Sequence, residues 1–174
     1  MMGGRRPASG AGSYFNASSN PRVAATGLCF RVLIHAGLKN GNLSTTREIS
    51  ECYGISSNHL MKVVYDLNVK GYLETIRGKK GGIRLGRSPE QINLGALIRD
   101  VEDDMALVEC HTSDTQCRIS SGCVLNGVVA DALKAFLAVF DRYTLADLLE
   151  ARGDLARLMD IDLNAPVSAR RVGR

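Results

Sequence analysis

Residues 56–86 of this 174-residue chain, SSNHLMKVVYDLNVKGYLETIRGKKGGIRLG, decide its fold. The first half of the stretch predicts a helix that ends at Gly71, because apolar side chains recur at i, i+3, i+4 and i+7, at Leu60, Val63, Val64 and Leu67. Two short extended runs follow, YLETI and GIRLG. The glycine-bearing RGKKGG between them is typical of a β-hairpin turn, with basic side chains at its tip.

The sequence before this stretch predicts two further helices. Residues 23–39, VAATGLCFRVLIHAGLK, are mostly apolar and are followed by an Asn-Gly turn signal at 40–41. A second helix begins near residue 44 or 45, where STTRE offers a hydroxyl N-cap and a glutamate close behind, and it stops at Gly54. A helix, a helix-turn-helix pair and a basic hairpin, in this order, indicate a winged helix-turn-helix domain.

The sequence after the hairpin predicts more helices. One begins with INLGALI, residues 92–98, and TLADLLEARGDLARLM adds a short amphipathic helix near the end. Between them, a long helix carries a broad apolar stripe at Val128, Val129, Ala132, Leu133, Phe136, Leu137 and Phe140. Such a face beside so small a domain is typical of a contact between subunits. The expected fold class is therefore mainly α, a winged helix-turn-helix domain with a small β-hairpin wing plus a long dimerisation helix.

Composition divides the chain into five parts. We expect a disordered N-terminal extension (1–20), a winged helix-turn-helix DNA-binding domain (21–104), a cysteine-rich loop (105–124), dimerisation helices (125–160) and a flexible tail (161–174). Residues 1–108 carry 14 Lys+Arg against 9 Asp+Glu, a balance of +5, whereas residues 109–174 carry 8 against 9, a balance of −1. The first part is therefore the one suited to a polyanion.

Compartment and membrane association follow from the same reading. No apolar run approaches the ~18 residues that cross a membrane, and MMGGRRPASGAGSYFNASSNP lacks the apolar centre of a secretory signal. We expect a cytoplasmic protein without a membrane partner. In that reducing compartment, five cysteines indicate thiols, metal ligands or redox groups rather than a disulfide framework.

Double-stranded DNA is the expected partner of the winged domain. In a helix-turn-helix, the start of the second helix meets base edges in the major groove. The candidate contacts on that helix are Ser57, Asn58, His59, Lys62 and Tyr65. The candidate contacts on the hairpin are Arg77, Lys79 and Lys80, within a run that contains five basic residues and no acidic one. The alternatives are that Ser56 or Ser57 only caps the helix, that His59 is a solvated surface residue, and that the basic run is a solvated turn.

Three of the five cysteines lie in ECHTSDTQCRISSGC, residues 109–123, with the spacing Cys-x6-Cys-x5-Cys. Thiolates are soft ligands, so this segment suits an iron–sulfur cluster or zinc, and both usually take four ligands. A disulfide-forming thiol switch and a loop with incidental cysteines are the other readings. Cys52, at the end of the second predicted helix, is expected to be a small core residue.

Residues 23–150 resemble the bacterial regulators related to the iron–sulfur assembly repressor IscR. The resemblance rests on the apolar first helix, on RGKKGGIRL, on the cysteine segment and above all on GCVLNGVVADALKAFLAVFDRYTLADL. Within that family the chain is most similar to the nitric-oxide-sensing NsrR group. The resemblance implies a homodimeric repressor, not an enzyme, that binds an iron–sulfur cluster and releases DNA when nitric oxide degrades the cluster. The cluster expected from the NsrR group is 4Fe–4S, with 2Fe–2S as the alternative. Iron or an oxidant is the alternative signal, and a metal-free thiol sensor is the rival.

The same resemblance implies that Cys110, Cys117 and Cys123 are cluster ligands, and it leaves the fourth ligand open. IscR-type members have a histidine where this chain has Asn126. In the NsrR group an aspartate near the start of the first helix is the fourth ligand, supplied by the other subunit, but the alignment puts Gly27 there. No Asp or Glu precedes Glu48. Cys29 is the replacement candidate, with a buried core position as its alternative; water or a small thiol is the remaining possibility.

Overall fold

The computed structural model describes residues 21–102, 105, 119 and 122–164. Along this part of the chain the elements are α1 (Pro21–Leu38), α2 (Thr46–Tyr53), α3 (Ser57–Val69), β1 (Leu73–Ile76), β2 (Gly82–Leu85), the 3-10 turn η1 (Pro89–Gln91), α4 (Leu94–Val101), α5 (Val124–Phe140), α6 (Leu145–Leu148) and α7 (Arg152–Leu158). The mainly helical fold class with one two-stranded antiparallel sheet is confirmed. Among the described helices, none is long and apolar enough to cross a membrane.

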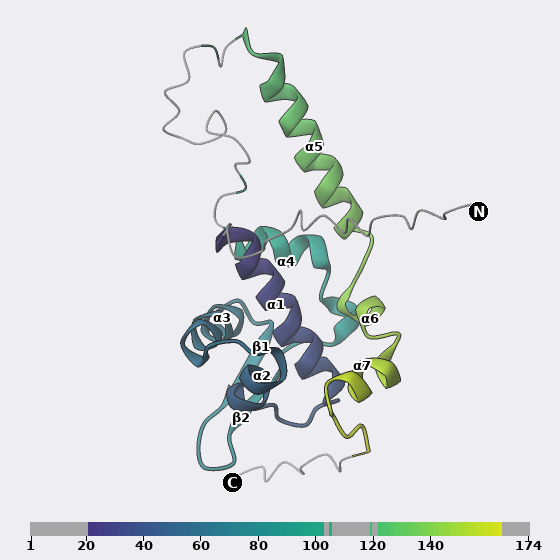
Figure 1. Ribbon diagram of the computed structural model, residues 1–174. Coiled ribbons are helices and arrows are strands. Elements are labelled where there is room, and N and C mark those ends of the chain that lie inside the picture. The colour runs from purple at the N-terminus through teal and green to yellow at the C-terminus, as the bar shows by residue number, and fades with distance from the viewer. Residues whose placement is uncertain (1–20, 103–104, 106–118, 120–121, 165–174) are drawn as a thin grey trace, which may run out of the picture.

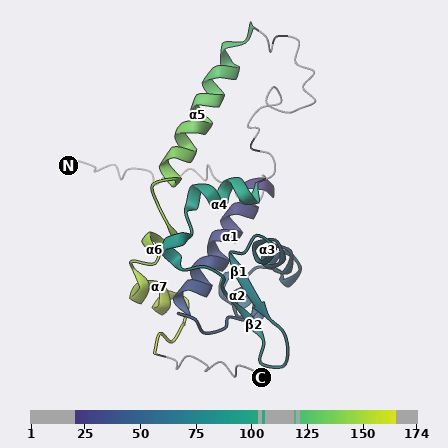
Figure 2. The ribbon, with the colours of Figure 1, turned by 180° about the vertical axis from the view of Figure 1, so that it is seen from behind.

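The winged helix-turn-helix is built around α1. This helix runs through the middle of the molecule, with α2, α3 and the hairpin on one side and α6 and α7 on the other (Figure 1, Figure 2). Strands β1 and β2 pair in a register that sets Leu73 opposite Leu85 and Ile76 opposite Gly82. Ser44 adds one more antiparallel pair, because its N–H and C=O bond the C=O and N–H of Ile83 at 2.8 and 2.7 Å.

Local capping explains why the two helices of the helix-turn-helix begin and end where they do. Thr45 and Glu48 form a complete capping box at the start of α2, and Gly54 closes that helix in the left-handed region at φ 63°. The Ser56 side chain accepts a hydrogen bond from the His59 N–H at the start of α3. The predicted cap positions are therefore confirmed, and the turn between α2 and α3 is fixed from both sides.

One hydrophobic core joins α1, α2, α3, the hairpin, α4 and α6. Eight of its members have no solvent exposure: Val32, Leu33, Ile49, Leu60, Leu67, Ile92, Leu97 and Leu145. The apolar stripe predicted for α3 lies on this side, because Leu60, Val64 and Leu67 are all buried. The core thus holds the recognition helix by one face and leaves the opposite face to solvent.

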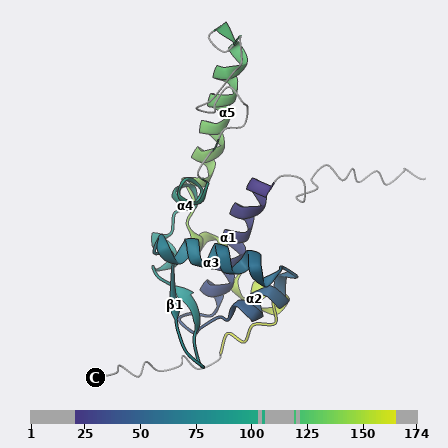
Figure 3. The ribbon, with the colours of Figure 1, turned by 90° about the vertical axis from the view of Figure 1, so that its left-hand side faces the viewer.

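Helix α5 extends away from this body beyond α4 (Figure 3). Its C-terminal end is fixed by Phe140, which stacks on Phe30 of α1 at a centroid distance of 6.1 Å. Asn93, which caps α4, donates hydrogen bonds to the carbonyls of Asp141 and Tyr143 at 2.8 and 3.2 Å. The end of α5 is therefore joined to the start of α4, whereas none of the α5 residues is buried.

Three sequence expectations need correction. Cys52 is not a core residue: it is exposed on α2, because the adjacent Tyr53 takes the inward position and donates a hydrogen bond to the Arg31 carbonyl at 3.2 Å. The helix expected from residue 92 begins at Leu94, after η1. The last amphipathic segment forms two short helices, α6 and α7, and Arg152 fastens the second to α1 by donating to the Leu38 carbonyl at 2.7 Å.

Candidate DNA-binding face and cysteine segment

All five side chains that were predicted to contact DNA from α3 lie on its solvent-exposed outer face. The side chains of Ser57, Asn58, His59, Lys62 and Tyr65 are exposed, and Tyr65 is 68% exposed. Met61, 56% exposed, lies among them and was missed from the sequence. Its place three residues after Asn58 and four before Tyr65 would have indicated the same face. An exposed helix face that carries hydroxyl, amide, imidazole and ammonium groups fits the major groove of DNA.

The hairpin tip carries three exposed basic side chains. Arg77, Lys79 and Lys80 are exposed, and in the part of the chain that the structure describes no carboxylate forms an ion pair with any of them. The tight turn depends on glycine: Gly78 has φ +111°, and a Cβ on Gly81 would lie 2.2 Å from the Ile76 carbonyl oxygen. The tip can therefore approach a phosphate backbone closely.

The other two basic residues of the run stabilise the wing instead. Arg84 pairs with Glu74 across the strands at 2.7 Å. Arg87 donates to the Lys70 carbonyl at 2.7 Å, and its guanidinium lies 4.6 Å from the centre of the Tyr72 ring. Within this run, at residues 77–87, the tip is thus the part left to bind an external anion.

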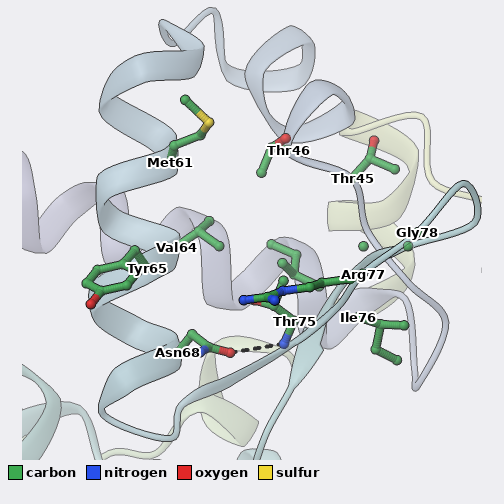
Figure 4. A pocket seen from close by; sticks show the side chains of 13 residues that line it. Thr45, Thr46, Met61, Val64, Tyr65, Asn68, Thr75, Ile76, Arg77 and Gly78 are labelled. Atoms are coloured by element: carbon green, nitrogen blue, oxygen red, sulfur yellow. Dashed lines mark hydrogen bonds between the residues drawn. The ribbon is translucent and has the colours of Figure 1, made fainter.

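A groove of about 550 Å³ separates α3 from the hairpin (Figure 4). Thr45 and Thr46 lie at one end of the groove, and Met61, Tyr65 and residues 75–78 line its sides. Asn68 fixes the two walls relative to each other, because its side-chain oxygen accepts a hydrogen bond from the Thr75 N–H at 3.0 Å. The Arg77 side chain points across the groove towards α3. Helix and wing therefore form one continuous surface for a partner.

The cysteine segment is described only at its end. Cys110 and Cys117 lie outside the described residues, and Cys123 is half-buried directly before the first turn of α5. The free N–H groups at a helix start favour a negatively charged neighbour there. Within the described ranges, no group of three or more His, Cys, Asp or Glu side chains is arranged to hold a metal ion. The three-cysteine ligand set therefore stays a prediction.

The Cys29 side chain points into the hydrophobic core. Its side chain is 4% exposed, and burial, reinforced by the nearby Glu102 and Asp66 carboxylates, raises the pKa of the thiol to about 12. The thiol is therefore protonated at neutral pH. Gly27, two residues earlier, faces open space: among the described residues, no atom lies within 4 Å of the position that a Cβ would take.

Comparison with known proteins agrees with this architecture. The model of the Rrf2 family, described as an iron-dependent transcriptional regulator, matches residues 24–151. The HTH-type transcriptional regulator NsrR of Bacillus subtilis is 49% identical over 136 residues, which cover 77% of this chain and 93% of that protein. NsrR of Halalkalibacterium halodurans is 41% identical over 138 residues, 78% of this chain and 94% of the relative.

Solved structures show the same fold. CymR of B. subtilis, a global cysteine regulator, superposes with a TM-score of 0.56 at 24% identity, over 71% of this chain and 92% of CymR. IscR of T. potens superposes with a TM-score of 0.56 at 23% identity, over 78% of this chain and 90% of IscR. This chain therefore belongs to the Rrf2 family and is a winged helix-turn-helix transcriptional regulator.

Proposed function

We propose that this chain is a cytoplasmic homodimeric repressor whose affinity for operator DNA is set by a nitric-oxide-reactive iron–sulfur cluster, of the 4Fe–4S type. One observation carries the proposal. The predicted ligand segment connects α4, which is packed on the DNA-binding core, to α5, whose apolar face is exposed. Identity of 40–49% to NsrR proteins of several bacteria and the iron-dependent description of the family support it.

DNA recognition in this proposal is divided between α3 and the wing. Asn58 and Lys62 have the chemistry to read base edges, since Asn pairs bidentately with adenine and Lys serves guanine or phosphate. Ser57, His59 and Tyr65 flank them. Arg77, Lys79 and Lys80 contact phosphates or the minor groove, which contributes affinity without base specificity.

Dimerisation in this proposal uses α5. Five of its large apolar side chains are about half or more exposed, with values of 81% for Val124, 55% for Leu125, 56% for Val128, 49% for Phe136 and 46% for Val139, whereas Val129, Leu133, Leu137 and Phe140 are partly buried. A contiguous apolar face of this kind on a projecting helix marks an interaction surface. A second copy of α5 would cover it and bring two recognition helices to two half-sites.

The donor set fits an iron–sulfur cluster. Cys110, Cys117 and Cys123 would hold it by soft thiolates, and the open space beside Gly27 leaves room for a group next to α1. When bound, such a cluster supplies iron that reacts with nitric oxide. The contribution of the chain is geometric: by fixing the segment before α5, the three cysteines set how α5 sits relative to the winged domain. The spacing of the two recognition helices then follows the state of this segment.

Mass spectrometry of the non-denatured, anaerobically purified protein tests the proposal. We expect iron and sulfide on the dimer, with loss of both after nitric oxide, and a brown colour that Cys117→Ala abolishes. Cys52→Ala is the matched control, because Cys52 is exposed but lies outside the segment. A colourless protein with one zinc per chain contradicts the proposal. DNA binding by metal-free protein that responds to peroxide and reductant favours the thiol sensor instead.

A further inference from the structure

The outer face of α3 carries a row of exposed, largely apolar side chains beside its polar groups. Met61, Tyr65 and Val69 follow one another at intervals of four residues and are 56%, 68% and 66% exposed. Single exposed apolar side chains are common on protein surfaces, but a row of them along one helix face indicates a surface that meets a partner. Met61 is the member of the row closest to the start of α3, where a recognition helix meets base edges.

The groups around Met61 favour nucleic acid as that partner. Met61 lines the groove between α3 and the hairpin, on the side of α3 that faces Thr46 (Figure 4). Lys62 is its exposed neighbour on α3, and Arg77 points across the same groove. A DNA duplex matches both the cations and the apolar side chain, because its phosphates flank the major groove in which the base edges lie.

The chemistry of the Met61 side chain selects one base. A thioether has no hydrogen-bond donor and is only a weak acceptor, so it does not read the amino, carbonyl and ring-nitrogen groups of the major groove. The C5 methyl group of thymine is the apolar group that the major groove displays. Methionine is unbranched and polarisable, so its side chain adapts to the shape of such a group. Met61 is therefore suited to thymine and not to the other three bases.

We propose that Met61 determines operator specificity by packing on the methyl group of a thymine in the major groove. This inference rests on the DNA binding through α3 in the proposed function and is independent of the cluster. Asn58, three residues earlier, has the chemistry to read an adenine. Three residues advance about 4.5 Å along a helix, against about 3.4 Å for one base step. The thymine therefore lies within one or two base steps of that adenine.

Replacing thymine by uracil tests this inference, because the replacement removes the methyl group and leaves the hydrogen-bonding groups of the base unchanged. The DNA is a fragment that the anaerobically purified wild-type chain selects from a random pool, with each thymine replaced in turn. We expect at least one replacement to weaken wild-type binding about fourfold, the effect of losing one buried methyl group. Met61→Ala should bind the thymine DNA more weakly and should not distinguish it from that uracil DNA.

Lys62→Ala is the matched control, because it removes a cation from the next position and keeps the methyl contact. It should weaken binding to both DNA fragments and leave their affinity ratio at the wild-type value. Met61→Gln keeps the length of the side chain but replaces the thioether by an amide, so it should also lose the discrimination. It takes the place of Met61→Ala if circular dichroism shows that Met61→Ala is unfolded. Fluorescence anisotropy measures all affinities.

The outcomes separate this inference from the function on which it rests. A wild-type protein that selects no DNA overturns the proposed function itself. A wild-type protein that binds DNA but is insensitive to every replacement of thymine by uracil overturns only the role of Met61, whether or not the variants fold. The same conclusion follows if the fourfold ratio persists in Met61→Ala or Met61→Gln, because another side chain then contacts the methyl group.

Discussion

A single buried pair, His35 and Ser44, links the central helix to the wing. The His35 Nδ1 and Ser44 Oγ are 3.0 Å apart, and the two residues are 2% and 0% exposed. Ser44 in turn pairs through its backbone with Ile83 on β2. Burial lowers the pKa of His35 from its usual value; nearby Lys39 lowers it further, whereas Glu48 opposes the shift. This imidazole is therefore held neutral in the folded protein.

Protonation of His35 should destabilise the fold at mildly acidic pH. Since the pKa of His35 is lower in the folded than in the unfolded chain, the unfolded chain binds more protons there. The contribution of neutral His35 to the free energy of unfolding is then fully present above about pH 6.5, and it is lost as the pH falls through the lowered pKa. Urea unfolding at pH 7.5 and 5.5 measures this loss, and we expect it to shrink in His35→Gln. The exposed His59→Gln is the control; an equal effect of both variants contradicts the prediction.

The cysteines show what could and could not be read from single residues. Periodicity places Cys52 on the face of Ile49, three residues earlier, yet it is exposed. The inward position next to it belongs to Tyr53, whose ring meets His35 edge-on at 6.5 Å and lies under the Arg31 guanidinium. These partners come from α1, so no pattern within α2 could reveal them. The contact between Glu102 and Thr26 is equally non-local, and the sequence offered no sign of it.

At the scale of elements, the basic residues of the wing are of two kinds: some are exposed at its tip, and others stabilise the hairpin. Arg77, Lys79 and Lys80 stand at the tip, whereas Arg84 is held by Glu74 and its side chain is 18% exposed. Charge that meets phosphates releases counterions, and this release gives binding its salt dependence. Neutralising a residue at the tip should therefore change the salt dependence of DNA binding, whereas neutralising Arg84 should not.

Removing the charges at the tip should weaken DNA binding and flatten its salt dependence. Each of Arg77→Ala, Lys79→Ala and Lys80→Ala leaves one phosphate without its cation, so the slope of log K against log salt should fall by about 0.9 in magnitude. Fluorescence anisotropy over a range of KCl concentrations measures it, with a DNA fragment that the wild-type chain selects from a random pool. Arg84→Gln, the control, should keep the wild-type slope. An equal reduction in Arg84→Gln would mean that the whole hairpin lies on the DNA.

The joint between α4 and α5 depends on one glycine. A Cβ on Gly95 would lie 2.0 Å from the Asp141 carboxylate oxygen. That carboxylate forms a bidentate pair with Arg99 at 2.6 and 2.8 Å, which fixes the end of α5 against α4. The close approach of the two elements therefore requires a residue without a side chain.

Gly95→Ala should consequently destabilise the protein, although alanine favours helix. We expect the free energy of unfolding to fall by about 1–3 kcal/mol, the usual cost of overpacking. Gly153→Ala in α7 is the matched control, since no atom of the described part of the chain lies within 4 Å of its Cβ position. It should stabilise the protein by about 0.4–1 kcal/mol. Thermal and urea unfolding measure both changes. Stabilisation by both substitutions would show that the Asp141 side chain moves aside freely.

The elements that local signals specify were predictable, and those that depend on distant contacts were not. The helix-turn-helix was readable because Thr45, Glu48 and Ser56 make their caps within four residues. The break between α6 and α7 was not, because it is fixed by the hydrogen bond from Arg152 to Leu38 on α1. The same holds for the candidate site: exposure of α3 and the tip followed from pattern, whereas the groove required Asn68 to join helix and hairpin.

At the scale of the whole molecule, the exposed apolar face on α5 lies apart from the folded winged helix-turn-helix body. The body buries its own core, so we expect it to fold without a partner. On α5, by contrast, Leu125, Val128 and Phe136 point their apolar surface at solvent. Burial of apolar area drives association, with about 25 cal/mol per Å² removed from water. In the dimer proposed above, folding and dimerisation are carried by different surfaces, and a substitution on α5 should separate them.

Val128→Glu should convert the proposed dimer into folded monomers with weak operator affinity. The added carboxylate would be buried against the apolar face of the second α5, and an unpaired buried charge is strongly disfavoured. A monomer reaches one half-site only, so the second recognition helix no longer contributes to binding. Sedimentation velocity measures the mass, circular dichroism the fold, and anisotropy the DNA affinity. Ala130→Glu is the control, because two residues along a helix turn the side chain by about 200°, away from Val128. A monomer with wild-type operator affinity, or a dimer that persists in Val128→Glu, contradicts dimerisation through α5 as the basis of DNA binding.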